Sequence, residues 1–316
     1  MDLPDIQMSS PEIPVRLNRV GARKIKKLVL VDRGEKRPVV LVANFDVFVD
    51  LDESLKGVNL SRNFEAIDEV VERLTLKPVK WIEELTESIA GDLLKRHDYA
   101  SHAEVQMSSE LIMRKRTPVS GNRTQEVVRI FSTSKAFRGK NVETWIGVEV
   151  WGTTACPCAQ ELMKARAERE LKKAGFDKKD IEKILKCITM PTHNQRGKAE
   201  VWVQLKGFRI SFERLIEVAK AGMSCEIYEL LKREDEAEVV EIAHKNPLFV
   251  EDSVRKMAER CVELLESINA PPETGVILRQ ENEESIHQHN VMAEVVASLE
   301  ELKQQLKCQR FDQLHV

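Results

Sequence analysis

The chain has 316 residues, of which 42% are hydrophobic and 32% charged, and its formal net charge is −3. This length is typical of two domains or one large one, and the hydrophobic share is enough to form a buried core, so the composition argues against a disordered chain. A general nucleic-acid-binding protein would be basic, which this chain is not, and we expect no nucleic-acid partner.

The sequence has no run of about 20 apolar residues, which a membrane-spanning helix needs. Its first residues, MDLPDIQMSSPEIP, carry acids and prolines where a signal peptide has a basic and then an apolar segment. We therefore expect a cytoplasmic protein with no membrane partner. In that compartment the six cysteines should stay reduced, and their irregular spacing does not resemble a disulfide framework.

Residues 1–17 are polar, contain three prolines and lack periodicity, so we expect an N-terminal tail. Two β-rich runs between residues 27 and 51 predict a hairpin. Apolar residues at helical spacing then predict helices over 63–76 and 81–97. Extended runs follow between residues 103 and 150, so the first half is expected to contain a sheet and two helices.

Helical patterns dominate the second half of the sequence. We expect helices over 158–174, 178–187, 211–221, 226–232, 249–268 and 291–307, a strand at 201–205 and an extended run over 275–286. Strands separated by pairs of helices predict an α+β fold with antiparallel strands, because parallel sheets alternate one strand with one helix. After the tail, two halves are expected, residues 18–155 and 156–316.

The segment TTACPCAQ at 153–160 ends an extended run and opens a helix, with Pro157 suited to the first helical turn. The start of a helix favours a thiolate, the form of cysteine that binds metals and attacks carbon. Cys156 and Cys158 are only two residues apart, so we expect one ligand and one neighbouring thiol. The alternative is that both are small buried hydrophobic residues.

Three further polar clusters contain candidate ligands or proton-transfer groups. His193 lies in a polar loop before a strand, where it is either functional or simply solvated. His287 and His289 would point the same way in an extended segment, so that one could bind a metal while the other orients it or transfers protons; the alternative is an ordinary strand end. Glu236 belongs to the charge run KREDE, which by itself predicts a solvated surface.

Imidazole, thiolate and carboxylate groups together suit Zn(II) or Fe(II). A catalytic metal site would keep one coordination position for water, whose ionisation the metal promotes. The residue types alone do not choose among the reactions that use activated water.

Six motifs occur in order along the chain: KGVNLSR at 56–62, CPC at 156–158, HNQR at 193–196, LLKREDE at 230–236, NPLFVED at 246–252 and ESIHQH at 284–289. Together they resemble the motifs of the type IB GTP cyclohydrolases of the tunnelling fold. The resemblance implies a bimodular fold in which antiparallel sheets are backed by helices. It also implies a homo-oligomer with active sites at subunit interfaces.

By this resemblance, Cys156 is a metal ligand with His193 and Glu236 as co-ligands. Glu251 matches the carboxylate that anchors the purine, and His287 matches a histidine suited to proton transfer or ligation. Catalytic roles are therefore implied for Cys156, His193 and His287. The implied substrate is GTP and the implied metal is Fe(II), for which Zn(II) or Mn(II) could substitute.

The implied reaction accounts for these residue types. One carboxylate can accept hydrogen bonds from both N1–H and the exocyclic amino group of guanine, so Glu251 would fix the base. Water activated by the metal opens the imidazole ring at C8, and a second hydrolysis releases C8 as formate. His193 or His287 would pass the protons.

Two departures from the bacterial pattern favour an archaeal branch of the family. Residues 164–186 add about two helices between the CPC and HNQR motifs, and the segment TACPCAQ also resembles the archaeal sequences. This branch implies formation of 7,8-dihydroneopterin 2′,3′-cyclic phosphate in methanopterin biosynthesis. The alternatives are a type IB enzyme that makes 7,8-dihydroneopterin triphosphate, and a non-catalytic metal- or nucleotide-binding protein on the same fold. The roles of Cys158 and His289 stay open.

Overall fold

The computed structural model describes residues 6–33, 36–75 and 79–312. The elements follow one another as β1 (Leu17–Arg33), β2 (Lys36–Leu51), α1 (Ser61–Thr75), α2 (Ile82–Arg96), β3 (His102–Arg116), β4 (Arg123–Phe137), β5 (Glu143–Ala155), α3 (Pro157–Lys173), α4 (Lys178–Cys187), β6 (Asn194–Leu205), α5 (Phe212–Ala221), β7 (Cys225–Glu226), α6 (Arg233–Lys245), α7 (Val250–Ser267), β8 (Gly275–Glu283), β9 (Val291–Ser298) and α8 (Leu299–Asp312).

The strands are hydrogen-bonded in the order β1-β2-β3-β4-β5-β6-β8-β9, and β7 pairs with β5. The pairs β1–β2, β2–β3, β5–β7 and β8–β9 run antiparallel. The predicted α+β class is therefore confirmed. None of the helices in the described part of the chain combines the length and the hydropathy that crossing a bilayer requires.

The chain divides into two compact units, each built from three segments. The first comprises residues 1–111, 129–147 and 203–211, and the second comprises residues 112–128, 148–202 and 212–316. The predicted halves, residues 18–155 and 156–316, stay a prediction.

The described part of the predicted N-terminal tail makes backbone contacts with its own chain. The backbone N–H of Lys56 donates to the carbonyl of Ser9 at 2.8 Å, and the N–H of Gly57 donates to the carbonyl of Gln7 at 3.1 Å. Residues 1–5 of this tail lie outside the described residues.

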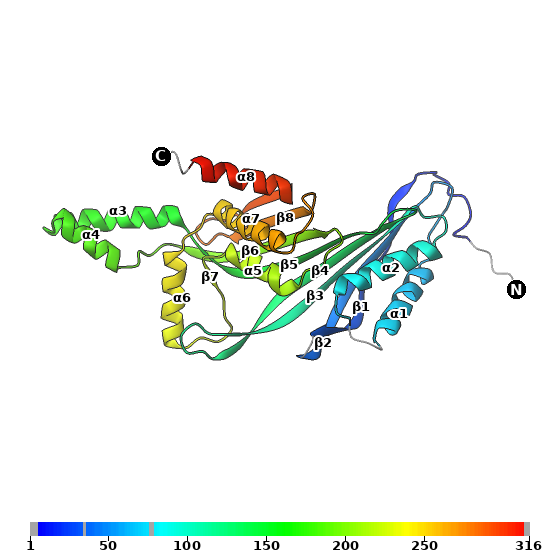
Figure 1. The fold of residues 1–316 in the computed structure, drawn as a ribbon, viewed down its shortest axis with the longest axis horizontal. Coiled ribbons are helices and arrows are strands. Elements are labelled where there is room, and N and C mark those ends of the chain that lie inside the picture. The colour runs from blue at the N-terminus through cyan, green and yellow to red at the C-terminus, as the bar shows by residue number, and fades with distance from the viewer. Residues whose placement is uncertain (1–5, 34–35, 76–78, 313–316) are drawn as a thin grey trace. The chain divides into compact units, whose positions relative to one another are not determined.

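In the first unit, α1 and α2 pack against each other and against β1 and β2 (Figure 1). Successive side chains of a strand point to opposite faces of the sheet, so every second residue of β2 can face the helices. Phe45 and Val47 follow this alternation and are fully buried, as are Ile67 of α1 and Ile89 of α2. These apolar faces form the core of the unit, as the helical spacing predicted.

A buried carboxyl group lies within this core, on the first turn of α2. Glu83 is only 1% exposed, and its Oε1 has no hydrogen-bond partner, although Nε of Arg209 lies 3.7 Å away. Burial raises the pKa of Glu83 to about 7, and the Arg209 charge only partly opposes this rise. Glu83 therefore holds a proton in the folded protein under conditions in which an exposed glutamate has lost it.

In the second unit, α7 packs against α5, α8, β8 and β9 (Figure 1). Its core contains fully buried side chains from three elements, namely Leu215 of α5, Met257 and Leu265 of α7, and Leu278 of β8. This apolar stripe of α7 matches the helix predicted over 249–268. The packing fixes α7 on the sheet, and with it the segment that leads into α7.

Two expected helices are wrong. Residues 226–232 form no helix, because Cys225 and Glu226 instead pair with β5 as β7. Residues 291–298 form β9, which pairs with β8, and only the helix that follows, α8, matches the expected helix over 291–307. In β9 the odd-numbered residues are more buried than their exposed neighbours, a period of two that the apolar spacing of 3 and 4 concealed.

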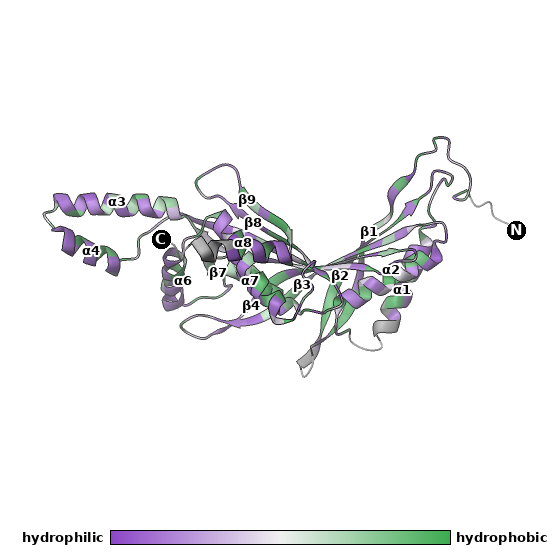
Figure 2. Cartoon of the chain, turned by 45° about the horizontal axis from the view of Figure 1, so that its top comes forward, coloured by the Kyte–Doolittle hydropathy of each residue, from purple (hydrophilic) through white to green (hydrophobic). Residues whose placement is uncertain are grey.

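The inserted segment forms a hairpin of two helices, α3 and α4, which contact each other (Figure 2). Cys156 is the N-cap of α3 and Asp177 is the N-cap of α4, and Gly175 between them has a φ of +93°, which favours glycine. No residue of α3 is buried, and in α4 only Ile181 is. The predicted pair of helices is confirmed, and it contributes little to the core.

Close packing between β6 and β8 depends on a residue without a side chain. A Cβ atom added at Gly197 of β6 would lie 2.5 Å from Nε2 of Gln280, 3.1 Å from Oδ1 of Asn282 and 3.2 Å from Cγ2 of Thr154. Gln280 and Asn282 are both at most 2% exposed and are hydrogen-bonded to each other at 2.9 Å. The neighbouring strands therefore have no free space for a methyl group at residue 197.

We expect Glu83→Gln to change how stability depends on pH. The unfolded chain loses the proton of Glu83 near pH 4.5 and the folded protein only near pH 7, so raising the pH across this window favours unfolding of the parent. The variant has no carboxyl group at residue 83 and does not lose stability in this way. Between pH 5 and pH 8 its free energy of unfolding, relative to that of the parent, should rise by up to about 3 kcal/mol. Urea unfolding at pH 5 and pH 8 measures this; an equal pH dependence in the two proteins would contradict it. Glu84→Gln, at the exposed neighbouring residue, is the matched control.

We expect Gly197→Ala to destabilise the protein by about 1–3 kcal/mol, because the added methyl group displaces buried side chains. Gly91 in α2 provides the matched control, since a Cβ atom there meets nothing within 4 Å. Gly91→Ala should stabilise the helix by roughly 0.5–1 kcal/mol. Thermal or urea unfolding of both variants is the measurement, and a neutral Gly197→Ala would show that the strands yield at this position.

Candidate functional site

A cavity of about 290 Å³ in the second unit brings together most of the residues that the sequence singled out. Its lining includes Cys156, His193, Glu251, His287 and His289. These residues come from the CPC, HNQR, NPLFVED and ESIHQH motifs, which are far apart in the sequence. The fold therefore joins four of the six motifs at one place.

Backbone hydrogen bonds at the end of β5 connect three of these motifs. The N–H of Cys156 donates to the carbonyl of His193 at 3.1 Å, and the N–H of Leu248 donates to the carbonyl of Ala155 at 2.9 Å. The hydroxyl of Thr192 donates to the carbonyl of Cys156 at 2.7 Å. The two main-chain bonds place the segments of Cys156, His193 and Leu248 side by side without involving side chains.

Cys156 is half-buried and occupies the N-cap position of α3, while Cys158 is exposed. The Sγ atom of Cys156 accepts a hydrogen bond from the backbone N–H of Ala159 at 3.5 Å. The sulfur therefore lies beside the free N–H groups of the first turn of α3. Cys156 lines the cavity, and Cys158 is absent from the residues described as lining it. The expectation of one ligand and one neighbouring thiol stays a prediction.

His193 lies just before β6, where the side chain of Gln195 contacts it. Nδ1 of His193 is 3.1 Å from Oε1 of Gln195 and 3.4 Å from Oγ of Ser285. Gln195 is 8% exposed and also lines the cavity. Sequence reasoning missed Gln195, because the strand was expected only at 201–205, whereas β6 begins at Asn194.

Sequence reasoning also missed His244 of α6, whose ring contacts the backbone of the loop that carries His193. Its Nδ1 is 2.6 Å from the carbonyl oxygen of Val240, and its Nε2 is 3.2 Å from the carbonyl oxygen of Thr192, next to His193. Nothing in the sequence around His244 distinguishes it from a surface helix residue. Its contact with Thr192 exists only in the folded protein.

His287 and His289 lie in the loop between β8 and β9 and are exposed. The extended conformation considered for this segment is not observed, because the strand ends at Glu283. Their rings nevertheless stack, with centroids 5.4 Å apart and planes at 19°. The two imidazoles therefore point the same way, and both line the cavity with Glu284.

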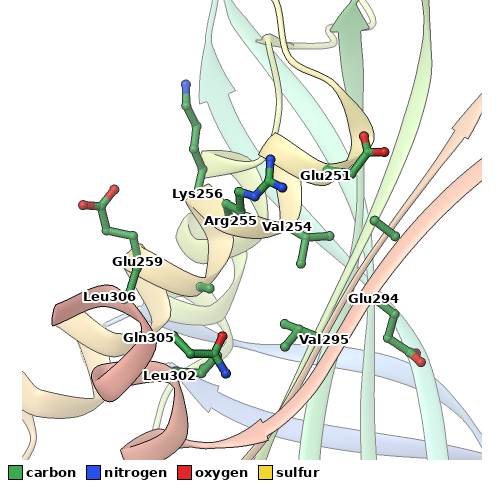
Figure 3. A pocket seen from close by; sticks show the side chains of 12 residues that line it. Glu251, Val254, Arg255, Lys256, Glu259, Glu294, Val295, Leu302, Gln305 and Leu306 are labelled. Carbon is green, nitrogen blue, oxygen red and sulfur yellow. The ribbon is translucent and has the colours of Figure 1, made fainter. Parts of the chain in front are cut away.

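Glu251 lies in the first turn of α7 and is exposed. The preceding residues, Leu248, Phe249 and Val250, form an apolar wall of the same cavity. Glu251 also lines a second cavity of about 430 Å³ between α7, β9 and α8. Figure 3 shows Glu251 at one end of this second cavity, away from Leu302 and Leu306 of α8.

Glu236 is not brought to the cavity. It is exposed on α6, whereas its neighbour Asp235 is fully buried. Asp235 accepts hydrogen bonds from the backbone N–H groups of Val119, Ser120 and Lys232 at 2.8–3.0 Å and from the hydroxyl of Ser120 at 2.6 Å. Burial alone would raise the pKa of Asp235, but these hydrogen bonds outweigh it and hold the pKa below its usual range.

The donor types around the cavity fit a transition metal. A cysteine at a helix start and three imidazoles are the groups that bind Zn(II) or Fe(II), and the hydrogen bond between His193 and Gln195 is typical of a ligating histidine. Within residues 6–33, 36–75 and 79–312, however, no three His, Cys, Asp or Glu side chains are already grouped as a metal site. No lysine or arginine is among the described residues that line the cavity.

Comparison with known proteins places these features in a family. Residues 3–293 match the family model of the type I GTP cyclohydrolase folE2. The chain is 48% identical over 312 residues to the GTP cyclohydrolase MptA of Methanosarcina barkeri, covering 96% of this chain and 97% of that protein. It is 47% identical over 308 residues to the GTP cyclohydrolase MptA of Methanoregula boonei, covering 96% and 94%.

Among solved structures, the uricase from Arthrobacter globiformis matches with a TM-score of 0.54 and 9% identity, covering 91% of this chain and 96% of that chain. At this identity the likeness shows a shared fold alone, and the predicted tunnelling fold is confirmed. The family match spans nearly the whole chain and includes the segments that form the cavity. The chain therefore belongs to the type I GTP cyclohydrolase folE2 family.

Proposed function

We propose that this protein is a GTP cyclohydrolase that opens the guanine ring of GTP at C8, releases formate and forms 7,8-dihydroneopterin 2′,3′-cyclic phosphate for methanopterin biosynthesis. The observation that carries the proposal is the single cavity lined by Cys156, His193, Glu251 and His287. The relatives named GTP cyclohydrolase MptA, similar over nearly the full chain, support the choice of substrate and branch.

Glu251 is proposed to hold the base. Its carboxylate would accept hydrogen bonds from N1–H and the amino group of guanine, a pair of donors that one carboxylate can satisfy. Leu248, Phe249 and Val250 lie beside it and offer an apolar surface for the purine ring. C8 lies at the opposite edge of the purine from N1, so a base held by Glu251 would direct C8 across the cavity, toward the other residues that line it.

Cys156 and His193 are proposed to hold a metal, Fe(II) with Zn(II) or Mn(II) as possible substitutes. When bound, the metal would promote ionisation of water at neutral pH and so supply the nucleophile for hydrolysis. The resemblance predicts Glu236 as the third ligand. His287 and His289 are the other imidazoles that line the cavity with Cys156 and His193.

His287 is proposed to transfer protons during ring opening, together with His193 where its ring is not engaged as a ligand. An imidazole exchanges protons near neutral pH and can serve as donor and acceptor in successive steps. The exposed loop position of His287 gives its ring access to solvent, so that protons can be replaced between steps.

Product analysis distinguishes the proposed activity from its alternatives. The protein, purified without oxygen and analysed for bound metal, is incubated with GTP, and the products are identified by mass spectrometry. The proposal expects formate, pyrophosphate and a pterin with one cyclic phosphate. A pterin triphosphate without pyrophosphate would assign the type IB reaction, and bound metal without formate release would favour a non-catalytic binding protein.

A homo-oligomer in the cytoplasm is also proposed. Strands β1 and β9 end the strand order. Within the described residues, the outer edge of β1 is bridged to Val79 at Val31, and the outer edge of β9 has no strand partner. Such edges are ready to pair with another chain. Light scattering after size-exclusion chromatography measures the mass, and a monomer at micromolar concentration would contradict the proposal.

We expect Cys156→Ala to lose most bound metal and formate release, because a thiolate ligand is removed. Cys158→Ala, at an exposed position outside the cavity lining, is the matched control and should retain both. Metal content by mass spectrometry and formate release from GTP are the measurements. Normal metal content and turnover in Cys156→Ala would eliminate this site.

The third ligand can be identified in the same assay. Loss of metal in Glu236→Ala but not in His287→Ala would support Glu236, and the reverse result would assign the imidazole. Because Glu236 is exposed and lies outside the cavity lining, loss of metal in its variant cannot come from a disturbed core.

We expect Glu251→Gln to weaken binding of GTP by roughly 10- to 100-fold while leaving the metal bound, because the amide offers one acceptor and turns a donor toward a guanine donor. Glu259→Gln, two turns further along α7 in the second cavity, is the matched control. Calorimetric titration with a GTP analogue whose guanine ring cannot be opened at C8 measures the affinity. Equal affinity in parent and Glu251→Gln would mean that another residue anchors the base.

A further inference from the structure

The side chain of Gln195 connects His193 to a buried residue of β5. Its Nε2 donates to Oγ1 of Thr154 at 3.0 Å, and its Oε1 lies 3.1 Å from Nδ1 of His193. Thr154 is fully buried and Gln195 is 8% exposed. The three side chains form a chain of hydrogen bonds that runs from the interior of the unit to the cavity.

This arrangement sets which nitrogen of His193 carries the proton. A glutamine side chain has one donor group and one acceptor oxygen. The donor is used on Thr154, so only the acceptor faces His193, and an acceptor oxygen requires N–H at Nδ1. In a neutral imidazole the other nitrogen, Nε2, then has a free lone pair.

Ser285 does not alter this assignment. Its hydroxyl lies 3.4 Å from Nδ1 of His193, but a hydroxyl can donate or accept and therefore fits either form of the ring. Ser285 is also exposed, whereas Gln195 is enclosed. The amide is the contact that distinguishes the two forms.

We propose that Gln195, hydrogen-bonded to Thr154, is a positioning residue that holds His193 in the Nδ1–H form and leaves Nε2 as the basic nitrogen of the site. The importance of this form for catalysis rests on the proposed function, in which Nε2 binds the metal or accepts a proton. The form itself follows from the orientation of the Gln195 amide, in which Nε2 faces Thr154 and Oε1 faces His193.

A neutral amide suits this place better than a carboxylate. A carboxylate would also accept from Nδ1–H, but it would add a negative charge beside a cavity that already contains Glu251 and Glu284 and no lysine or arginine among its described lining residues. Glutamine orients the ring without this added charge.

Gln195 lies on a closely packed face of β6. On the same face of β6, two residues further on, Gly197 is closely approached by Thr154, Gln280 and Asn282. Asn282 is 2% exposed and lines the cavity beside Gln195. Gln195 is thus enclosed on this face, with its Nε2 on Thr154.

Nuclear magnetic resonance of ¹⁵N-histidine-labelled, metal-free protein tests the proposal directly, above the pH at which the ring is protonated. The signals of His193 are assigned with a His193→Asn variant. The parent should show the Nδ1–H form. In Gln195→Leu the two forms should mix, in Gln195→Glu the Nδ1–H form should persist, and in Thr154→Val the amide loses its partner and part of the Nε2–H form should appear.

Metal affinity gives a second readout. Removing a group that orients a ligating histidine typically costs 10- to 100-fold in metal affinity, so Gln195→Leu should weaken binding of Zn(II) by that factor and Gln195→Glu should retain it. Gln280→Leu is the matched control, because it removes another fully buried amide that does not contact His193. It should leave the form of the His193 ring unchanged.

Two results would overturn the proposal. One is a predominant Nε2–H form in the parent, and the other is an unchanged ring form in Gln195→Leu. Both are measured without GTP and without metal, so they are separate from the turnover assay. A protein that does not convert GTP could still confirm the role of Gln195, and an active enzyme could still refute it.

Discussion

The main-chain hydrogen bonds of Ala155 and Cys156, at the end of β5, are the constraint on which the site depends. One bond leads to His193 and another to Leu248, so two residues organise three segments. Leaving a buried backbone group without its partner costs about 1–3 kcal/mol, which makes each connection hard to exchange for another. Because these bonds involve no side chains, the side chains of Cys156 and His193 are not needed to hold the segments together.

Asp235 and Glu236 show how adjacent carboxylates can have separate tasks. Asp235 is enclosed and satisfied by four donors, so its role is to join the turn at residues 117–122 to the start of α6. Glu236 has its side chain in solvent and is free to meet a ligand. The turn-to-helix connection fixes the backbone from which Glu236 projects.

The sequence predicted most of the fold because apolar periodicity is a local property. The helices α1, α2, α3, α4, α5 and α7 could all be placed from it within a few residues. The segment 291–298 could not, since its valines and alanines fit a period of two as well as a helical stripe, and only pairing with β8 decides between them. Residues 226–232 fail for the same reason, because pairing with β5 is a long-range contact.

The site was predictable only where a motif carried it. Cys156, His193, Glu251 and His287 could be named in advance and do line one cavity. His244 could not, because its ring reaches the carbonyl of Thr192 across a separation of 52 residues. Glu236 was named as a ligand from the motif alone. The charge run around it predicted its exposure, but not that it lies outside the cavity lining.

The hairpin of α3 and α4 begins at Cys156 and returns to His193, and the backbone bond between these two residues closes it at its base. The entropy of closing such a loop grows only logarithmically with its length, by about 0.6 kcal/mol for each doubling. Since α3 buries none of its residues and α4 buries only Ile181, the body of the unit loses little packing when this segment changes. Evolution can therefore lengthen, shorten or replace the hairpin while the thiol and the imidazole at its base keep their places, which makes it a module that diverges independently of the chemistry.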